Sequence, residues 1–247
     1  VFDMEKLTIG LLNDSFPPLI DGVANAVVNY AEVIEKYYGK AIVVTPAYPK
    51  ADDGKYSFPV IRYPSINTSR LVGYRAGYPF SPETAKQLLQ QKTALLHTHC
   101  PIASTFMARS LRDLLKVPVV FTYHTKFDID IRNALKGKFL QENSIRALVQ
   151  NIEACDEVWV VSRGAGDNLR SIGYTGEYII MENGVDMPYG RVAQEKSDEA
   201  AKGFDLPEGV PVFLFVGRLQ WYKGLRIILD ALKMLQEKKI DFRMVFI

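Results

Sequence analysis

The sequence has 247 residues, of which 48% are hydrophobic and 23% are charged, and its formal net charge is +2. This composition fits a globular protein with a sizeable core. The presence of only two cysteines excludes a disulfide framework or a cysteine-based zinc site and fits a reducing cytoplasm. No apolar run is longer than a strand, so we expect neither a signal peptide nor a transmembrane span, and we expect a cytoplasmic protein.

The charge is unevenly distributed along the chain. Residues 62–146 contain 13 Lys and Arg but only 5 Asp and Glu, a balance of +8. The rest of the chain has a balance of −6. The basic third could face an anionic lipid surface, a phosphorylated substrate or nucleic acid. It contains no run of consecutive lysines or arginines, so nucleic acid is the least favoured and we expect no nucleic-acid partner.

Apolar runs that fit strands alternate along the chain with segments of helical spacing. We expect strands at residues 7–12, 41–45, 58–63, 95–99, 117–123, 157–161, 178–181 and 212–216. We expect helices that begin at Gly22 and at the Ser-Pro pair 81–82, and others over 101–115, 131–154, 164–172 and 225–235. Pro59 lacks a backbone donor, so the strand at 58–63 is expected at an edge of the sheet.

The strands are continuous apolar runs, which is typical of an α/β fold with a doubly wound parallel sheet covered on both faces. We expect one complete domain over residues 1–186 and a polar linker over 187–209. Residues 210–247 are expected to form the first strand–helix–strand of a second domain. Because the final strand has only begun to be buried, we expect the chain to be a fragment of a longer protein.

All three histidines lie at the carboxyl ends of predicted strands, where open α/β sheets bind ligands. His97 and His99 are separated by one residue, and we expect their side chains to point to opposite faces, which disfavours a shared metal ion. We expect His97 to be a packed core residue and His124 to be a functional one. Asp128 and Asp130 form a D-x-D sequence where a helix begins, and we interpret them as partners of the helix dipole. We therefore expect no metal.

Two loops are candidate ligand sites. Gly22 at the start of a helix allows a ligand to approach backbone N–H groups closely, although the loop is not a dinucleotide fingerprint and NAD is not expected. The second loop joins a buried strand to a helix and holds Arg218 and Lys223 between Gly217 and Gly224. Two cations beside a helix N-terminus would stabilise a leaving pyrophosphate. The alternative for this loop is a pair of solvated cations.

The segment from Lys126 to Arg146 mixes basic and large apolar side chains. Such a basic amphipathic helix can lie on an anionic membrane surface. The alternative is a solvated helix whose lysines extend along an apolar face.

Six short motifs, in order along the chain, resemble those of the family 4 retaining glycosyltransferases. The matching segments are residues 18–27, 96–99, 117–125, 156–162, 183–186 (N-G-V-D) and 216–224 (the G-R-L…K-G donor loop). The resemblance implies a GT-B fold with two Rossmann-like domains and no metal or other cofactor. It also implies that residues 1–186 bind the acceptor and that residues 210–247 begin the domain that binds the nucleotide sugar.

The resemblance also implies roles for single residues. Arg218 and Lys223, with Gly217, would hold the diphosphate of the donor, and His124 would lie near the transferred sugar, so His124, Arg218 and Lys223 are the implied catalytic residues. Gly22 would lie near the phosphate or the sugar. Asp21, Val23 and His99 are the implied acceptor-side residues.

The chain departs from the family pattern in three ways. Asp21-Gly22 replaces a glycine pair, and Glu182 replaces the proline that commonly precedes N-G-V-D. The family's downstream pair of glutamates would lie beyond Ile247, so we expect the 247 residues alone to be inactive.

The implied reaction is transfer of a hexose from a nucleotide-diphosphate sugar, UDP-glucose or similar, with retention of anomeric configuration. The basic amphipathic segment and a general resemblance to Firmicutes-type glucolipid synthases favour a lipid acceptor such as diacylglycerol. The protein would then lie peripherally on the inner face of the membrane. The alternatives are a transferase with a soluble acceptor, a UDP-sugar epimerase of GT-B fold, and a non-catalytic module that binds nucleotide sugars.

Overall fold

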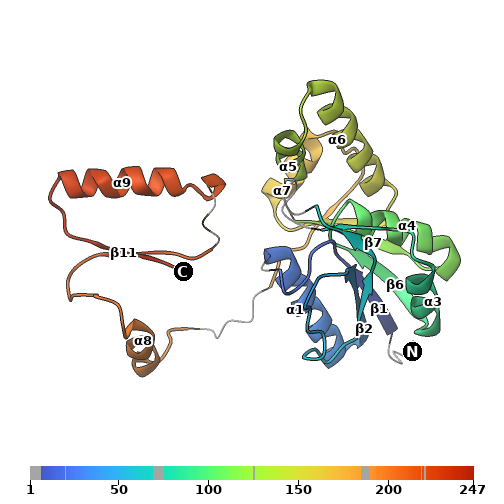
Figure 1. Ribbon diagram of the computed structural model, residues 1–247, viewed down its shortest axis with the longest axis horizontal. Helices are drawn as coiled ribbons and strands as arrows, with labels where there is room; N and C mark the ends of the chain where they lie inside the picture. The colour runs from blue at the N-terminus through green and yellow to red at the C-terminus, as the bar shows by residue number, and fades with distance from the viewer. Residues whose placement is uncertain are drawn as a thin grey trace. The chain divides into compact units, whose positions relative to one another are not determined.

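The computed structural model describes residues 7–19, 21–68, 75–124, 126–184, 190–217, 219 and 221–247. The chain divides into two compact units, residues 1–185 and residues 186–247 (Figure 1). The first unit contains a seven-stranded sheet and the second a pair of strands.

The sheet of the first unit is entirely parallel and confirms the predicted α/β fold. Its strands lie in the order β3-β2-β1-β6-β7-β8-β9. Their bounds are β1 (Leu7–Leu12), β2 (Gly39–Pro46), β3 (Val60–Tyr63), β6 (Thr93–Thr98), β7 (Val119–Tyr123), β8 (Glu157–Val160) and β9 (Ile179–Ile180). The strand that follows Pro59 is an edge strand, as predicted. The order reverses between β1 and β6, which creates a topological switch point.

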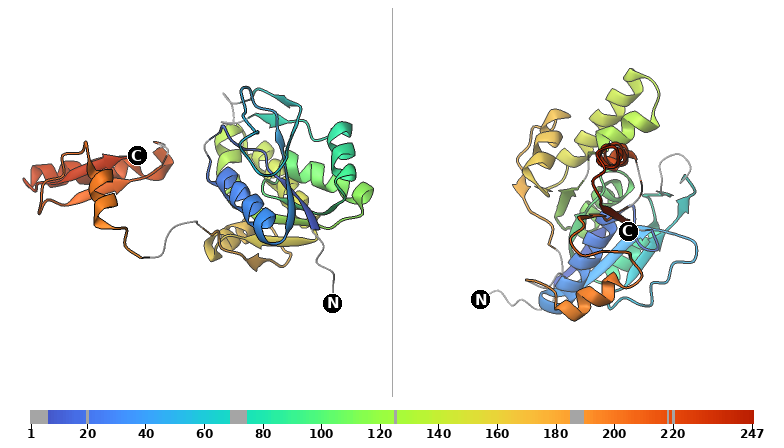
Figure 2. Two further views of the ribbon diagram at one scale, coloured as in Figure 1. Left: turned by 90° about the horizontal axis from the view of Figure 1, so that it is seen from below. Right: turned by 90° about the vertical axis from the view of Figure 1, so that its left-hand side faces the viewer.

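Helices cover the two faces of this sheet (Figure 2). Their bounds are α1 (Gly22–Tyr37), α3 (Pro82–Gln90), α4 (Ala103–Leu115), α5 (Phe127–Ala134), α6 (Lys138–Glu153) and α7 (Arg163–Ser171). Alternate residues along a strand face opposite sides, so Leu11 packs with α1 residues such as Val27, while Leu12 packs with α4 residues such as Met107. The predicted cap of α3 is confirmed, because the Ser81 side chain accepts a hydrogen bond from a backbone N–H of the first turn.

The helix predicted over 131–154 is wrong as a single element. The chain instead forms α5 and α6, which are separated at residues 135–137. Gly137 has a φ of +94°, a conformation outside the helical region that glycine adopts without a steric penalty. The Gln141 side chain donates to the carbonyls of Arg132 and Leu135, at 3.1 Å and 2.9 Å, and so satisfies acceptors at the end of α5.

A short antiparallel pair, β4 (Ser65–Ile66) and β5 (Ala76–Gly77), lies within the stretch that follows β3. The Arg75 guanidinium donates to the Ser65 hydroxyl at 2.8 Å and holds the two strands together.

The first helix of the second unit is α8 (Gln194–Ala201), which lies inside the segment expected to be a polar linker. It continues with β10 (Val212–Phe215), the short 3-10 helix η1 (Trp221–Lys223), α9 (Leu225–Glu237) and β11 (Arg243–Phe246). The strands β10 and β11 pair in parallel, which confirms the predicted strand–helix–strand. None of the described residues from 190 onward is buried, because the two strands and few helices of this unit enclose little apolar surface. In the described part of the chain, no helix is both long enough and apolar enough to cross a membrane.

Candidate active site

The carboxyl ends of β1, β6 and β7 lie next to one another at the switch point. Leu12, Thr98 and Phe121 are aligned across the three strands, and the pairing extends past β6 because the His99 N–H donates to the Leu12 carbonyl at 2.9 Å. The residues directly after these strands therefore share one edge of the sheet. This is the edge at which open α/β sheets bind ligands.

Asp14, two residues after β1, is a fully enclosed carboxylate that joins the two halves of the sheet. It accepts hydrogen bonds from the backbone N–H groups of Ala103 (3.0 Å) and Ser104 (2.7 Å) and from the Ser104 hydroxyl. It thereby caps α4 from another strand. Burial raises the pKa of this carboxyl, although its hydrogen bonds act in the opposite direction. Sequence analysis missed this residue, because its partners lie about 90 residues away.

The loop between β1 and α1 is organised around Asp21. The Asp21 carboxylate accepts from the Ser15 hydroxyl at 2.7 Å and from the Ala24 N–H at 3.4 Å, and so caps α1. Gly22 follows as the first residue of α1 and is exposed. A Cβ at Gly22 would meet no described atom within 4 Å, so packing does not require glycine there. The open space at this helix N-terminus is compatible with the predicted ligand approach. Val23, the third predicted residue of this loop, is half-buried.

The expectation that His97 and His99 point to opposite faces is wrong. Their ring centroids lie 4.1 Å apart, because residues two positions apart on a strand share a face. Both rings also contact the ring of Tyr30 on α1, at centroid distances of 5.3 Å and 5.4 Å. His97 is the packed core residue that was predicted: it is 4% exposed and its Nε2 lies 2.7 Å from the Thr122 hydroxyl.

The structure brings His99 and His124 together. The Nδ1 of His99 lies 2.9 Å from the Nε2 of His124. On the other side of the His124 ring, Asn183 Nδ2 lies 3.5 Å from Nδ1. His99 is completely buried, and its Nε2 has no hydrogen-bond partner among the described residues, whereas His124 is only partly buried. The two predicted site histidines therefore form one unit, and Asn183 is a further member that sequence analysis did not assign.

Burial keeps the three imidazoles neutral near pH 7. It lowers the pKa of His97 to about 3 and that of His124 to about 4, and it lowers the pKa of His99 well below the usual value. For His124 the nearby Asp21 carboxylate acts in the opposite direction. At neutral pH each ring therefore has one nitrogen that donates and one that accepts.

In the second unit, the structure describes part of the predicted diphosphate loop. Gly217 has a φ of +144° and ends β10, and Gly224 has a φ of +80° and precedes α9. These backbone conformations explain why glycines flank the loop. Lys223 is exposed at the end of η1. Arg218 lies outside the described residues.

Two further features lie apart from the histidines. Asp128 and Asp130 occupy the first turn of α5, as interpreted from the sequence, and the described residues contain no group of three His, Cys, Asp or Glu placed to hold a metal ion.

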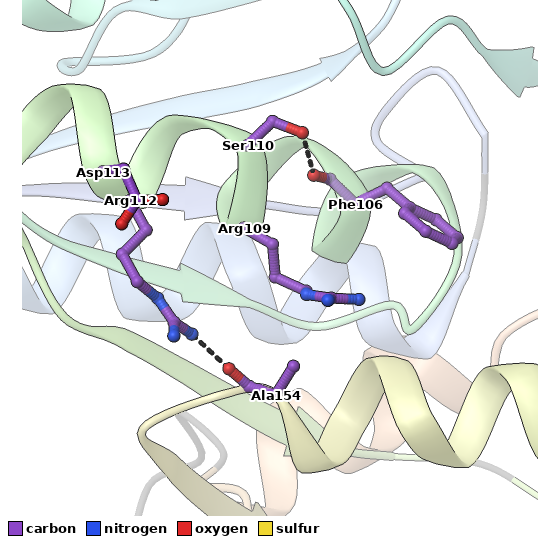
Figure 3. A pocket seen from close by; sticks show the side chains of 6 residues that line it. All are labelled: Phe106, Arg109, Ser110, Arg112, Asp113 and Ala154. Carbon is purple, nitrogen blue, oxygen red and sulfur yellow. Dashed lines mark hydrogen bonds between the residues drawn. The ribbon is translucent and has the colours of Figure 1, made fainter.

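A cavity of about 330 Å³ is lined by Phe106, Arg109, Ser110, Arg112, Asp113 and Ala154 (Figure 3). Its arginines donate to Asn151 and to the Ala154 carbonyl and so fasten α4 to the end of α6.

Comparisons with known proteins identify the fold. The Arabidopsis thaliana starch synthase IV catalytic domain, in a structure bound to ADP and acarbose, is similar with a TM-score of 0.64 and 15% identity, over 98% of this chain and 68% of that one. TarM is similar with a TM-score of 0.62 and 10% identity, over 99% of this chain and 72% of that one. These likenesses show that the chain has the fold of GT-B glycosyltransferases.

Curated relatives point the same way. The alpha-monoglucosyldiacylglycerol synthase of Streptococcus pneumoniae is 24% identical over 91% of this chain and 52% of its own length. The sulfoquinovosyl transferase SQD2 of Arabidopsis thaliana is 25% identical over 87% of this chain and 39% of its own length. The chain thus spans about half the length, or less, of the curated relatives it matches. The model of Glycosyltransferase Family 4 matches residues 20–188, more than half of the sequence and nearly all of the first unit. The chain therefore belongs to Glycosyltransferase Family 4.

Proposed function

We propose that the full-length protein transfers a hexose from a nucleotide-diphosphate sugar, UDP-glucose or a similar donor, to an acceptor with retention of anomeric configuration. The observation that carries the proposal is the site at the switch point. There a neutral, partly exposed imidazole, His124, shares the sheet edge with an uncrowded helix N-terminus at Gly22. Membership of a glycosyltransferase family supports the reaction class.

In this proposal the two units contribute different groups. Arg218 and Lys223 of the second unit hold the diphosphate, and their positive charge stabilises the leaving group as the bond to the sugar breaks. In the first unit, Gly22 lies near the phosphate or the sugar and His124 lies near the transferred sugar. Because these cations and the helix dipole neutralise the phosphates, the reaction requires no metal ion. The leaving phosphate helps to remove the proton of the acceptor hydroxyl.

Asp21 and Val23 are proposed for the acceptor side, whereas His99, which is completely buried, lies behind His124 and does not contact the acceptor. The acceptor is proposed to be a membrane lipid such as diacylglycerol. The names of the synthase relatives support this choice, and so does the surface formed by α5 and the start of α6. Phe139 is 81% exposed beside the exposed Lys136 and Lys138. Apolar and basic side chains in this combination suit an anionic membrane. Because α5 and α6 are separate helices, the contact is the surface of two short helices, and the protein binds the inner face of the membrane peripherally.

The reaction is tested with the full-length protein, UDP-glucose, and vesicles that contain diacylglycerol and an anionic lipid. We expect free UDP and an α-linked glucosyl lipid, whose anomeric configuration is read by proton NMR. Appearance of an epimerised UDP-sugar would support the epimerase alternative, and neither product would support a binding module. We expect the 247-residue chain alone to give no turnover, so transfer by that chain at the full-length rate would contradict its proposed incompleteness.

The membrane contact is tested by co-sedimentation with anionic vesicles. Replacing Lys136 and Lys138 by glutamine should weaken binding about 30-fold, since each basic residue near such a surface contributes about 1 kcal/mol. The matched control replaces the exposed Lys86 and Lys92 by glutamine, the same change in charge elsewhere on the first unit. Equal losses in the two double variants, or no binding by the unmodified protein, would refute the contact.

A further inference from the structure

Asn183, His124 and His99 form a line of side chains that we call the histidine relay. Asn183 lies against Nδ1 of His124 at 3.5 Å, and Nε2 of His124 lies against Nδ1 of His99 at 2.9 Å. The relay runs from the exposed edge of the first unit into its interior, since His99 is completely buried and the contact between Asn183 and His124 is exposed.

The contacts of the relay favour one proton position on each ring. The Asn183 amide nitrogen faces Nδ1 of His124 at 3.5 Å and can only donate, which favours a proton on Nε2 of His124. The His124 Nε2–H then donates to Nδ1 of His99. This leaves the proton of His99 on Nε2, the nitrogen without a partner among the described residues. Both rings are neutral near pH 7, so each keeps one accepting nitrogen.

His99 is held more firmly than His124. Its backbone N–H continues the pairing with β1 through the Leu12 carbonyl, and its ring contacts the rings of both His97 and Tyr30. Its orientation is therefore fixed by the sheet and by α1. His124 follows the end of β7 and is only partly buried. The hydrogen bond that one ring nitrogen makes sets which nitrogen of a histidine carries the proton.

We propose that His99 is a positioning residue that holds His124 in the Nε2–H tautomer, so that Nδ1 of His124 offers a lone pair at the exposed end of the relay. A ligand hydroxyl that reaches this nitrogen donates to it and displaces the weak contact with Asn183. The role of His99 deepens the proposed function. That the hydroxyl belongs to a sugar rests on that function. The tautomer itself does not depend on the enzymatic activity.

The tautomers are tested by long-range proton–nitrogen NMR of the 247-residue chain labelled with ¹⁵N-histidine, at pH 7. We expect the Nε2–H pattern for both His124 and His99 in the unmodified protein. The His99→Asn variant keeps an acceptor near the position of Nδ1 and should keep the His124 pattern. The His99→Leu variant removes the acceptor and should give a mixture of both His124 tautomers. The control is His97→Gln, which alters a neighbouring ring that has no hydrogen bond to His124 and should leave its pattern unchanged.

Two results would overturn the proposal: a proton on Nδ1 of His124 in the unmodified protein, or an unchanged His124 tautomer in His99→Leu. The first measurement needs no substitution, so the test survives any variant that fails to fold.

A kinetic readout links the relay to the reaction. In the full-length protein, His99→Leu should lower kcat by about tenfold with little change in KM for the donor, while His99→Asn restores most of the rate. Equal rates for His99→Leu and the unmodified enzyme would refute the positioning role. An unmodified enzyme with no transferase activity would refute the proposed function, and the NMR result would still decide the tautomer.

Discussion

Acidification from pH 7 to pH 5 should destabilise the first unit, because its neutral histidines must remain unprotonated to stay buried. An unfolded histidine has a pKa of about 6.5, whereas in the folded chain the pKa of His97 is lowered to about 3 and that of His124 to about 4. Below pH 6.5 the unfolded state therefore binds more protons than the folded state. Stability consequently falls as the pH falls.

The size of the effect follows from linkage. Between pH 7 and pH 5, each of these two histidines lowers the free energy of unfolding by about 2 kcal/mol, or about 4 kcal/mol together. His99 acts in the same direction, since its pKa is also lowered. Asp14 acts in the opposite direction, because its pKa is raised and the folded state is then the stronger binder of protons. A loss of about 4 kcal/mol is a large part of the stability of an ordinary domain.

The assay is urea unfolding at pH 7, 6 and 5, followed by the fluorescence of Trp159, whose ring contacts His97 edge-on at 5.0 Å. A Trp221→Phe background removes the signal of the second unit. His97→Gln should lower the slope of unfolding free energy against pH by about 1.4 kcal/mol per pH unit between pH 5 and 6, because one titrating group has been removed. Identical slopes with and without His97, or greater stability at pH 5 than at pH 7, would refute the reasoning.

Three further predictions concern stability and ligand binding. Asp14→Ala should lower the free energy of unfolding by about 2 to 4 kcal/mol in urea titrations, because it removes the buried cap of α4, whereas Asp21→Ala at the more exposed cap of α1 should cost about 1 kcal/mol; equal losses would contradict the distinction. Gly39→Ala should cost about 2 kcal/mol or more, since its Cβ would lie 2.2 Å from the Leu7 carbonyl oxygen. Gly22→Ala, whose Cβ meets nothing within 4 Å, should change stability by less than about 0.5 kcal/mol yet weaken binding of UDP-glucose in calorimetry; unaltered binding would argue against a ligand at this helix terminus.

The fold could be predicted because its strands and helices follow from patterns of neighbouring residues in the sequence. The β2 and β7 strands are buried on both faces, so each is a continuous apolar run, and such runs between helical segments indicate a parallel sheet. The predicted cap Ser81 lies next to the helix it begins. The break between α5 and α6 was missed because it depends on the positive φ of Gly137, and an isolated glycine within a helical pattern is often tolerated.

The site was predictable in part. The positions of His99 and His124 after neighbouring strands follow from the parallel arrangement, but their hydrogen bond depends on the register between β6 and β7. The shared face of His97 and His99 was available from the two-residue repeat of a strand, and the opposite expectation was wrong. Asn183 and Asp14 act on residues 59 and about 90 positions away, and no local pattern reports such contacts.

The connection between Asp14 and α4 has a consequence for the order in which the molecule forms. The strand β1 is synthesised before its neighbour β6, and the N–H groups of Ala103 and Ser104 follow some 90 residues after Asp14. Until β6 and the start of α4 leave the ribosome, the Asp14 carboxylate remains solvated and one side of β1 stays without a partner strand. Contacts of this sequence separation slow folding, because a long loop must close before they form. The switch point that gathers the site residues is therefore also a seam that a nascent chain cannot close until Ser104 has left the ribosome.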